Sequence, residues 1–371
     1  MKKLLLATVI SALSISAVQA APKVYGKLFV GTDYTSKKGQ NGADDVNTTS
    51  VNSNASRFGI KGEDELTPTL SAVYQIEWGV SADGDTKGDL SQRNRFLGLK
   101  SIDLGTVKWG RFDTATKESQ NKVDLFNDMV AEQLDMKNVL AGENRVNNVI
   151  GYEAPEIEGV PVKFTANLIL DQEKTAGDSN TNVNGGLSGS KNGDNGLSAS
   201  VAYDQAGVYV ALAGDKKVNN TFVGAVSTAV PSDIIRVVGQ FDLAQIAQVT
   251  GLTVGALYEN TKPSDTNVVV DQQDAYLLSA SYKLPESTGM DGFGLFAQYQ
   301  QSKTALKLAG SPDDLKRTQV GGGVTYAFSP KTTVYGYVAQ QKFDAVTVAA
   351  TNTYARDVKT NFIGMSLEHK F

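Results

Sequence analysis

Hydrophobic and polar residues alternate along most of this chain, in segments of about ten residues. Residues 24–33 follow this pattern near the start, and residues 363–371 follow it near the end, where Ile363, Met365 and Leu367 share one face. A period of two predicts β-strands with one apolar and one polar face. Beyond the N-terminal segment, no apolar run approaches the ~18 residues of a membrane-spanning helix. The pattern therefore predicts an all-β protein.

The segments that connect the predicted strands are alternately short and long. The short turns are residues 65–69, 102–105, 155–161, 204–207 and 329–331. The long polar loops are residues 36–55, 82–92, 114–145, 171–196, 214–232, 261–274, 302–317 and 342–360. Short periplasmic turns that alternate with long outer loops are typical of outer-membrane barrels, so the connections favour a barrel over a soluble sandwich.

Sixteen strands fit between these connections, and this even number brings both ends of the sheet to the same side. The two edges can then pair with each other, so that no backbone group is left unpaired in the membrane. Residues 221–230 fit either a strand or a loop, and residues 242–250 fit a long turn that is partly helical. The even number requires the first to be a loop and the second a turn. We therefore expect a 16-stranded antiparallel transmembrane β-barrel.

Charged residues on the polar faces of the strands are expected to line the lumen. Phe58 and Ile60 mark the lipid side of one strand, so Arg57 and Lys61 should point inward. The same reasoning gives further inward charges: Arg93 and Arg95 opposite Phe96, Glu77 opposite Ile76, and Lys108 between Val107 and Trp109. On the lipid face, an arginine or lysine near the membrane midplane would cost about 2–4 kcal/mol. These residues either set the field felt by a passing ion or merely solvate the lumen.

The long loop at residues 114–145 differs from the others because it mixes acidic and apolar residues. Leu125-Phe126 and Met129-Val130 stand at near-helical spacing, which predicts a short turn packed against another surface. We expect this third loop to fold into the lumen and to pack on the inner wall. Its carboxylates would then face the inward arginines and lysines across a narrow passage. The acids of the loop are Glu118, Asp124, Asp128, Glu132, Asp135 and Glu143, and the first four are the candidates for facing the constriction.

The N-terminal segment and the composition indicate an exported protein. Residues 1–20 carry basic Lys2 and Lys3, then an apolar stretch, then small residues before Ala21, which is the order of a secretory signal peptide. We expect cleavage there, which leaves residues 21–371 as one barrel domain. The chain has no cysteine, so disulfides cannot hold the exported fold together. The formal net charge of −5 argues against a nucleic-acid partner.

Residues suited to catalysis or metal binding are few. The single histidine, His369, shares a face with Leu367 and Phe371, so we expect it at the membrane interface rather than beside a nucleophile. Residues 178–185 hint at a calcium-binding loop, but Val183 stands where the motif needs glycine. We therefore expect no enzymatic activity, no cofactor and no metal site.

Several segments, taken in order, resemble the general trimeric porins of Gram-negative outer membranes. They are Val24-Tyr25-Gly26-Lys27, the stretch from Ser56 to Glu63, Gly98-Leu99-Lys100, the stretch from Leu104 to Arg111, the stretch from Arg145 to Tyr152 with Pro155, the stretch from Tyr326 to Thr332, and the terminal Phe371. Each match is short, but together they cover the whole length. The Pro-Glu-Phe-Gly-Gly element that enterobacterial members carry in the third loop is absent, and the loop is longer.

This resemblance implies an integral outer-membrane protein, exported through the periplasm, with the third loop folded into the lumen. It also implies a homotrimer that contacts outer-membrane lipid and lipopolysaccharide and that is assembled with periplasmic chaperones and the barrel-assembly machinery. By position, the family's basic constriction cluster falls on Lys27, Arg57, Arg93 and Arg145, and an inward acid falls on Glu77. Phe371 corresponds to the family's assembly signal.

Passive diffusion of small hydrophilic solutes and ions through a constricted barrel is the function that these features predict. Two other classes remain open: a plugged barrel whose outer loops act in adhesion or structure, and a barrel hydrolase. A lumen closed to small sugars would favour the first, and the poorly placed His369 disfavours the second.

Overall fold

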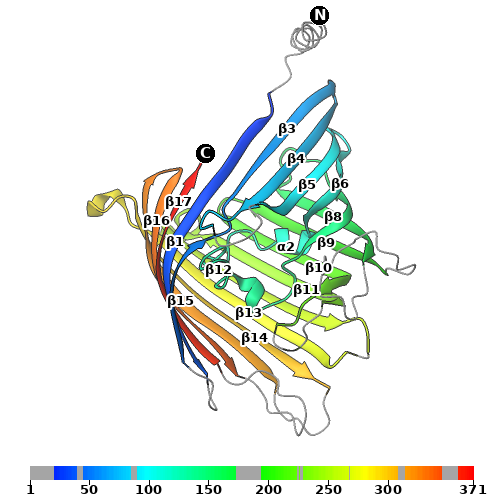
Figure 1. Ribbon diagram of the computed structural model, residues 1–371. Helices are drawn as coiled ribbons and strands as arrows, with labels where there is room; N and C mark the ends of the chain where they lie inside the picture. Colours follow the sequence, from blue (N-terminus) through cyan, green and yellow to red (C-terminus); the bar gives the residue numbers. More distant parts are fainter. Residues whose placement is uncertain are drawn as a thin grey trace, which may run out of the picture.

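The computed structural model describes residues 21–39, 45–84, 90–172, 194–223, 225, 229–266, 268–307, 314–344 and 358–371. Within these residues, antiparallel strands form a single barrel, and both described ends of the chain lie at the same end of it (Figure 1). The expected signal peptide and the rejected calcium motif at residues 178–185 lie outside the described residues.

The sheet consists of strand segments that pair with their neighbours in sequence. They are β1 (Lys23–Gly39), β2 (Val46–Ser53), β3 (Arg57–Thr67), β4 (Leu70–Val80), β5 (Leu90–Ser101), β6 (Gly105–Asp113), β7 (Arg145–Glu153), β8 (Val162–Gln172), β9 (Asp194–Gln205), β10 (Val208–Asn220), β11 (Val230–Asp242), β12 (Leu252–Pro263), β13 (Val270–Lys283), β14 (Phe293–Leu306), β15 (Leu315–Ser329), β16 (Thr332–Asp344) and β17 (Val358–Lys370).

The expected count of sixteen barrel strands is confirmed, because β2 and β3 are two halves of one strand. Both pair with β1, β2 along its distal part and β3 along its first residues, and only residues 54–56 separate them. The barrel closes where β1 pairs with β17, from Lys27 opposite Lys370 to Gly39 opposite Val358. Closure leaves no sheet edge exposed to lipid.

Helical structure is limited to short segments, namely α2 (Ala115–Glu118), α3 (Leu243–Ala247) and two single 3₁₀ turns, η1 (Met136–Asn138) and η2 (Glu286–Thr288). α3 confirms the partly helical turn at residues 242–250, and the described residues between β10 and β11, 221–223, 225 and 229, are not in a strand. Several loops are shorter than expected, because strands such as β1, β2 and β10 continue their pairing into segments predicted as loop. In the described part of the chain, no helix is long and apolar enough to cross a membrane.

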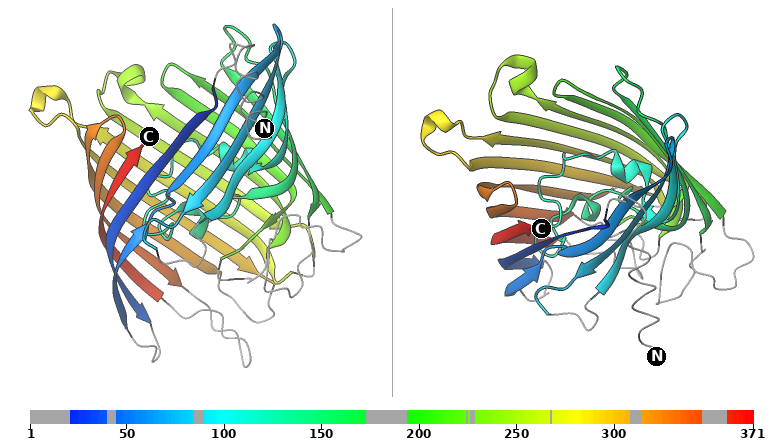
Figure 2. Two further views of the ribbon diagram at one scale, coloured as in Figure 1. Left: turned by 45° about the horizontal axis from the view of Figure 1, so that its top comes forward. Right: turned by 90° about the horizontal axis from the view of Figure 1, so that it is seen from above.

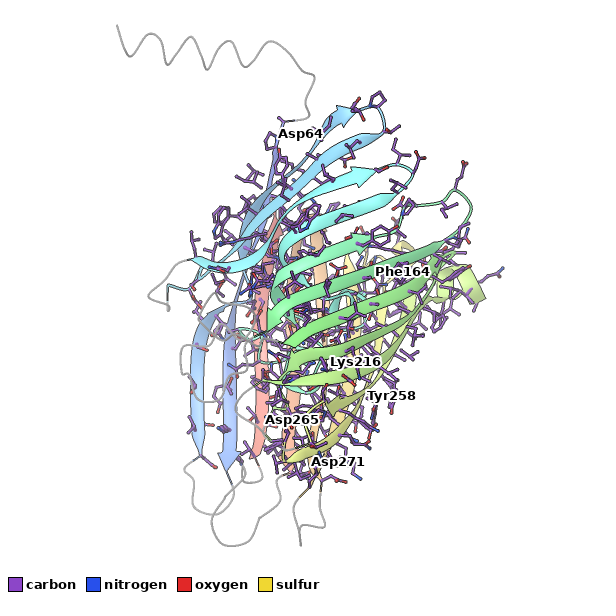
Figure 3. All side chains as sticks on the ribbon, turned by 90° about the vertical axis from the view of Figure 1, so that its right-hand side faces the viewer. Asp64, Phe164, Lys216, Tyr258, Asp265 and Asp271 are labelled. Carbon is purple, nitrogen blue, oxygen red and sulfur yellow. The ribbon has the colours of Figure 1, made fainter. Side chains whose placement is uncertain are left out.

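The alternation of apolar and polar side chains follows the expected faces on most strands. Val24, Leu97, Ile235 and Met365 all lie on the outer wall and are at least 60 % exposed. Figure 3 shows side chains such as Phe164 and Tyr258 projecting from the outside of the strands. On β17, Ser366 and Glu368 are buried on the opposite, inner face. The barrel therefore has an apolar exterior and a polar interior, as a membrane-spanning barrel requires.

Strand β5 departs from the predicted orientation. Arg95 lies opposite Ile76, on the outer face that also carries Leu97, whereas Phe96 lies opposite Gln75 on the lumen face. The prediction that Arg95 points inward is therefore wrong. A β-bulge is the cause, because Arg93 and Asn94 together face the single residue Glu77, which shifts the alternation by one residue.

Candidate functional site

The loop between β6 and β7, residues 114–144, lies inside the barrel, as predicted. Figure 2 shows this segment and α2 within the ring of strands. Thr114 caps α2 by accepting a hydrogen bond from the Lys117 backbone, which turns the chain into the lumen. The apolar residues of the loop then pack on the inner wall in two clusters. One contains Phe126, Met129, Val130 and Leu134 with Phe29, Phe296, Tyr337, Ala339 and Phe362, and the other contains Val123, Met136 and Leu140 with Ala211, Val238, Leu257, Ala275 and Leu277.

Amide side chains of the wall bind the backbone of the loop. Gln298 Oε1 accepts from Leu125 N at 2.6 Å, and Gln319 Nε2 donates to Leu134 O at 2.8 Å. Asn54, in the gap between β2 and β3, accepts from Ala131 N at 2.9 Å. Because buried backbone groups need partners, these inward amides hold the loop along the wall from β10 to β17. The start of the loop lies on β8 and β9, where Thr116 N donates to Ser198 Oγ at 3.1 Å, so the wall from β4 to β7 is the part that the loop leaves facing the lumen.

Arg236 on β11 clamps the two ends of the loop together. Its side chain is fully buried, and its guanidinium donates to the backbone oxygens of Thr116 and Ala141, both at 3.0 Å. It also pairs with Glu143 of the loop at 2.7 Å and with Glu259 of β12 at 2.6 Å. A guanidinium with five donors suits such a buried junction.

Gly142 is required at this clamp. Its φ of +79° is left-handed, and a Cβ at this position would stand 2.5 Å from Arg236 Nη2 and 2.6 Å from Glu259 Oε2. Only glycine leaves room for the guanidinium and adopts this backbone conformation without strain.

Asp124 joins two parts of the loop through hydrogen bonds to its carboxylate. One carboxylate oxygen accepts from Phe126 N at 3.1 Å and from Gln298 Nε2 at 2.8 Å, and the other accepts from Met136 N at 2.9 Å. Burial raises the pKa of Asp124 to about 7, and the neighbouring Asp135 adds to this effect. The carboxylate therefore has a structural position within the loop and does not meet the basic wall.

Asp128 is the loop acid that meets the basic wall. Its Oδ2 lies 2.9 Å from Lys27 Nζ and 3.2 Å from Arg57 Nη1. Lys27 also pairs with Glu368 of β17 at 3.2 Å. These two cations hold the pKa of Asp128 below its usual value despite burial. Lys27 and Arg57, which the family resemblance assigns to the constriction, are thus brought together with one acid of the third loop.

A second group of paired charges lies on β4 and β5. Arg93 Nε lies 2.6 Å from Glu77 Oε1, while Glu77 Oε2 accepts from Tyr25 Oη at 3.0 Å. Gln75 Nε2 donates to the same hydroxyl at 2.7 Å. Arg93 and Glu77 therefore occupy the lumen face, as predicted, but they neutralise each other.

The remaining predicted lumen cations also have carboxylate partners or aromatic neighbours. Arg145 Nε lies 3.1 Å from Asp113 Oδ1, beside the first turn of the loop. Lys108 Nζ lies 2.6 Å from Glu153 Oε1 and 4.6 Å from the centre of the Phe112 ring. Lys61 is exposed, with its ammonium 5.1 Å from the centre of the Tyr25 ring.

The other two loop acids that are candidates for the constriction, Glu132 and Glu118, do not contact the basic wall. Glu132 pairs with Lys137 of the loop itself. Glu118, in α2, is exposed. Of the four acids proposed for the constriction, the structure therefore brings Asp128 alone into contact with Lys27 and Arg57.

The main anchors of the loop were not predicted from the sequence. Arg236 stands in the run Ile234-Ile235-Arg236-Val237-Val238, which is apolar on both faces. Because arginine is almost never fully buried unless it is paired, its place in this run was the available signal for a buried partner.

A cavity of about 960 Å³ lies against the uncovered wall, near the turns 102–105 and 155–161. Phe96, Lys108, Glu153 and Lys163 are among the residues that line it. Among the described residues, no group of three or more histidine, cysteine or acidic side chains could hold a metal ion. His369 Nδ1 lies 2.9 Å from Thr332 Oγ1 at the exposed rim. The chemistry of the interior is therefore that of paired charges around water-accessible space.

Comparison with known proteins agrees with this architecture. The family model described as "Gram-negative porin" matches residues 6–346. The chain is 24 % identical over 388 residues to the major outer membrane protein P.IB of Neisseria lactamica, an alignment that covers both chains fully. Alignments with the corresponding proteins of two other Neisseria species span less than half of those relatives.

Solved structures share the fold. An anion-selective porin from Comamonas acidovorans superposes with a TM-score of 0.67 at 18 % identity, covering 95 % of this chain and 99 % of that chain. The trimer form of OmpT, an outer membrane protein of Vibrio cholerae, gives 0.60 at 16 % identity, with 95 % and 99 % coverage. With the family model matching most of its length, the chain belongs to the Gram-negative porin family.

Proposed function

We propose that this porin conducts small hydrophilic solutes and ions by passive diffusion, through the part of the lumen that the third loop leaves uncovered. The protein is an integral β-barrel of the outer membrane. The observation that carries the proposal is the third loop, bound along β10 to β17 and meeting Lys27 and Arg57 through Asp128. A loop fixed in this way narrows the lumen, and charged groups at the narrowing select among ions.

Planar-bilayer recording with the purified, folded protein tests this function. We expect stepwise increases in current, each proportional to the applied voltage. If the folded protein produced no channels, or if proteoliposomes containing it were closed to small sugars, a plugged barrel would replace the diffusion channel.

Neutralising Arg57 and Arg93 together, as Arg57→Gln/Arg93→Gln, should shift ion selectivity severalfold toward cations. Asp128 and Glu77 would each lose a neutralising partner, so the field at the constriction would become more negative. The reversal potential in a salt gradient measures this shift. Arg57→Lys/Arg93→Lys keeps both charges and is the matched control, and equal reversal potentials for the wild type and the glutamine variant would contradict the role.

We also propose that the protein forms a homotrimer. Two charged residues on the outer wall of the barrel support this. Arg95 and Arg111 lie opposite each other on the outside of β5 and β6, between Trp78 and Trp109. In lipid each arginine would cost up to about 2–4 kcal/mol, depending on its depth, whereas contact with another copy of the chain could supply acceptors.

Charge reversal at this face, as Arg95→Glu/Arg111→Glu, is expected to convert trimers into folded monomers. Light scattering in detergent measures the mass, and the change in mobility on heating in SDS gels reports whether each barrel is folded. Arg95→Lys/Arg111→Lys should remain trimeric. Trimers in the glutamate variant would show that this face is not the subunit interface.

A further inference from the structure

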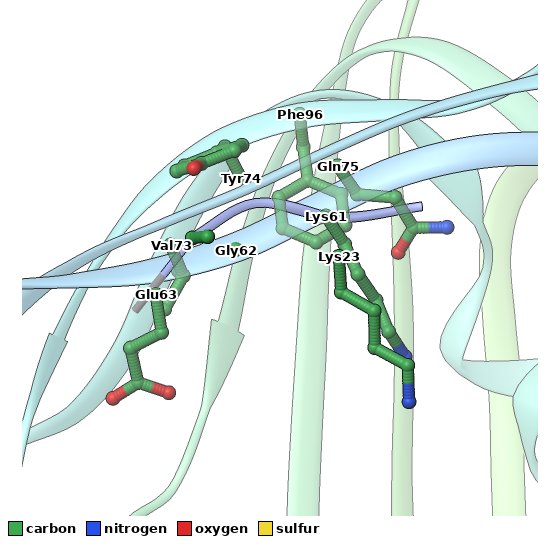
Figure 4. A pocket seen from close by; sticks show the side chains of 9 residues that line it. Lys23, Lys61, Gly62, Glu63, Val73, Tyr74, Gln75 and Phe96 are labelled. Carbon is green, nitrogen blue, oxygen red and sulfur yellow. The ribbon is translucent and has the colours of Figure 1, made fainter. Parts of the chain in front are cut away.

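A row of lumen-facing residues crosses the wall near the end of the barrel that carries the short turns. Lys23 on β1 lies directly opposite Lys61 on β3, Lys61 lies opposite Gln75 on β4, and Gln75 lies opposite Phe96 on β5. Figure 4 shows the two lysine side chains running side by side, with their ammonium groups close together. The fold thus places two positive charges next to each other in the lumen.

These two lysines differ from the cations beside the third loop. Lys27, Arg57, Arg93 and Lys108 each have a carboxylate partner. Among the contacts of the described residues, neither Lys23 nor Lys61 has one, and the ring of Tyr25 is the neighbour of Lys61.

The carboxylates near the lysine pair are already engaged. Glu63 pairs with Lys100 at 3.1 Å, and Glu77 pairs with Arg93 at 2.6 Å. Like charges directly opposite each other in a sheet are destabilising, so a mobile anion between Lys23 and Lys61 would relieve their repulsion.

The lysines line a cavity of about 390 Å³, a size that suits a small solute. Val73 and Phe96 form an apolar part of its wall, and Gln75 contributes an amide (Figure 4). Ala21 is also among the residues that line the cavity. Cleavage before Ala21, as the sequence predicts, would leave the new terminal ammonium beside the two lysines. Glu63 also lines the cavity, with its carboxylate paired to Lys100, so the cavity offers positive charge, one paired carboxylate, an amide and an apolar surface.

We propose that Lys23 and Lys61 form a binding site for small oxyanions, carboxylates or phosphates, on the short-turn side of the constriction. This inference rests on the proposed channel function and adds a solute class to it. The charges at the constriction are neutralised in pairs. The positive charges without a carboxylate partner, which attract anions, therefore lie on the short-turn side of the constriction. An anion held between the two lysines would be concentrated next to the narrow passage and could leave again, because both side chains are exposed to water.

Inorganic phosphate is the probe for the first experiment. At constant ionic strength, phosphate replacing chloride should reduce the single-channel current of the wild type. Lys23→Gln and Lys61→Gln should each raise the concentration for half-maximal block about fivefold, the upper end of what an exposed charge pair contributes. Lys37→Gln removes the same charge from the same face of β1 at its other end and should behave as the wild type. Equal block of the wild type and of Lys23→Gln/Lys61→Gln would overturn the proposal.

A second measurement does not depend on conductance. In the detergent-solubilised wild type, phosphate should slow acylation of Lys23 and Lys61 by a small amine-reactive reagent, relative to acylation of Lys37, as read by mass spectrometry of peptides. Equal protection of all three lysines would overturn the site. A preparation that protects Lys23 and Lys61 but conducts no current would support the site and contradict the channel function.

Discussion

Replacing Arg236 with methionine is expected to release the third loop from the wall and to raise the single-channel conductance. The guanidinium joins Thr116, Ala141 and Glu143 of the loop to Glu259 of the wall. Its removal leaves Glu143 and Glu259 buried without a cation, and breaking a buried charge pair in this way costs about 3–5 kcal/mol. Detachment of the loop relieves this penalty by admitting water. Conductance steps should become larger and noisier, and a protease should cut the loop faster.

The matched control removes the stranded acids together with the arginine. In Arg236→Met/Glu143→Gln/Glu259→Gln the two acids that pair with Arg236 lose their charge as well, so the loop should stay closer to the wall than in Arg236→Met alone. Wild-type conductance and wild-type proteolysis in the single variant would contradict the role of Arg236 as the clamp.

Replacing Gly26 with alanine is expected to prevent the barrel from closing. A Cβ at Gly26 would stand 2.6 Å from the backbone oxygen of Arg57 and 2.5 Å from Cζ of Phe371. The first clash is with backbone on β3, so no rotation of a side chain relieves it. Crowding of a packed site usually costs about 1–3 kcal/mol, and here it falls on the junction of β1, β3 and the residue after β17. The yield of folded barrel, measured by its mobility on unheated gels, should fall sharply.

Gly336→Ala is the control for this prediction. Gly336 is also a strand glycine, but a Cβ there would meet Val324 Cγ2 at an ordinary 3.5 Å. This variant should fold as the wild type does. If Gly26→Ala folded equally well, Phe371 would not be held in the position that the structure gives it.

The barrel itself could be predicted from the sequence because its two environments alternate along each strand. Residues such as Val24 and Met365 must face lipid, and their neighbours Tyr25 and Ser366 must face the interior, so the period of two is strict. Strand ends were less predictable, since pairing beyond the membrane needs no apolar side chains. For this reason β1 and β2 continue into the expected loop at residues 36–55.

The orientation of Arg95 could not be read from the alternation because one residue interrupts it. The sequence Arg93-Asn94-Arg95-Phe96 fits either face until the pairing with β4 shows the bulge opposite Glu77. Bulges depend on the partner strand, which a single strand does not reveal. Leu97 and Leu99 are exposed and mark the true outer face.

The position of the third loop was predicted in outline, and its anchors were not. The mixture of Phe126, Met129 and acidic residues indicated that the loop packs on the wall. The partner residues lie far from the loop in the sequence, 185 positions apart for Gln319 and Leu134, and the strands that carry them are apolar on both faces because the loop covers the inner one. Which loop acid meets Lys27 and Arg57 depends on that docking, and local sequence does not determine it.

The pairing of β1 with β17 has a consequence for biogenesis. Lys27 meets Glu368 across 341 positions of sequence, so the first strand to be exported waits for its partner until nearly all of the chain has arrived. Throughout that interval the backbone N–H and C=O groups at the edge of β1 are unpaired and can pair with another chain, which leads to aggregation. Pairings between strands so far apart in the sequence also form slowly. The barrel can therefore close only when nearly the whole polypeptide is available for pairing.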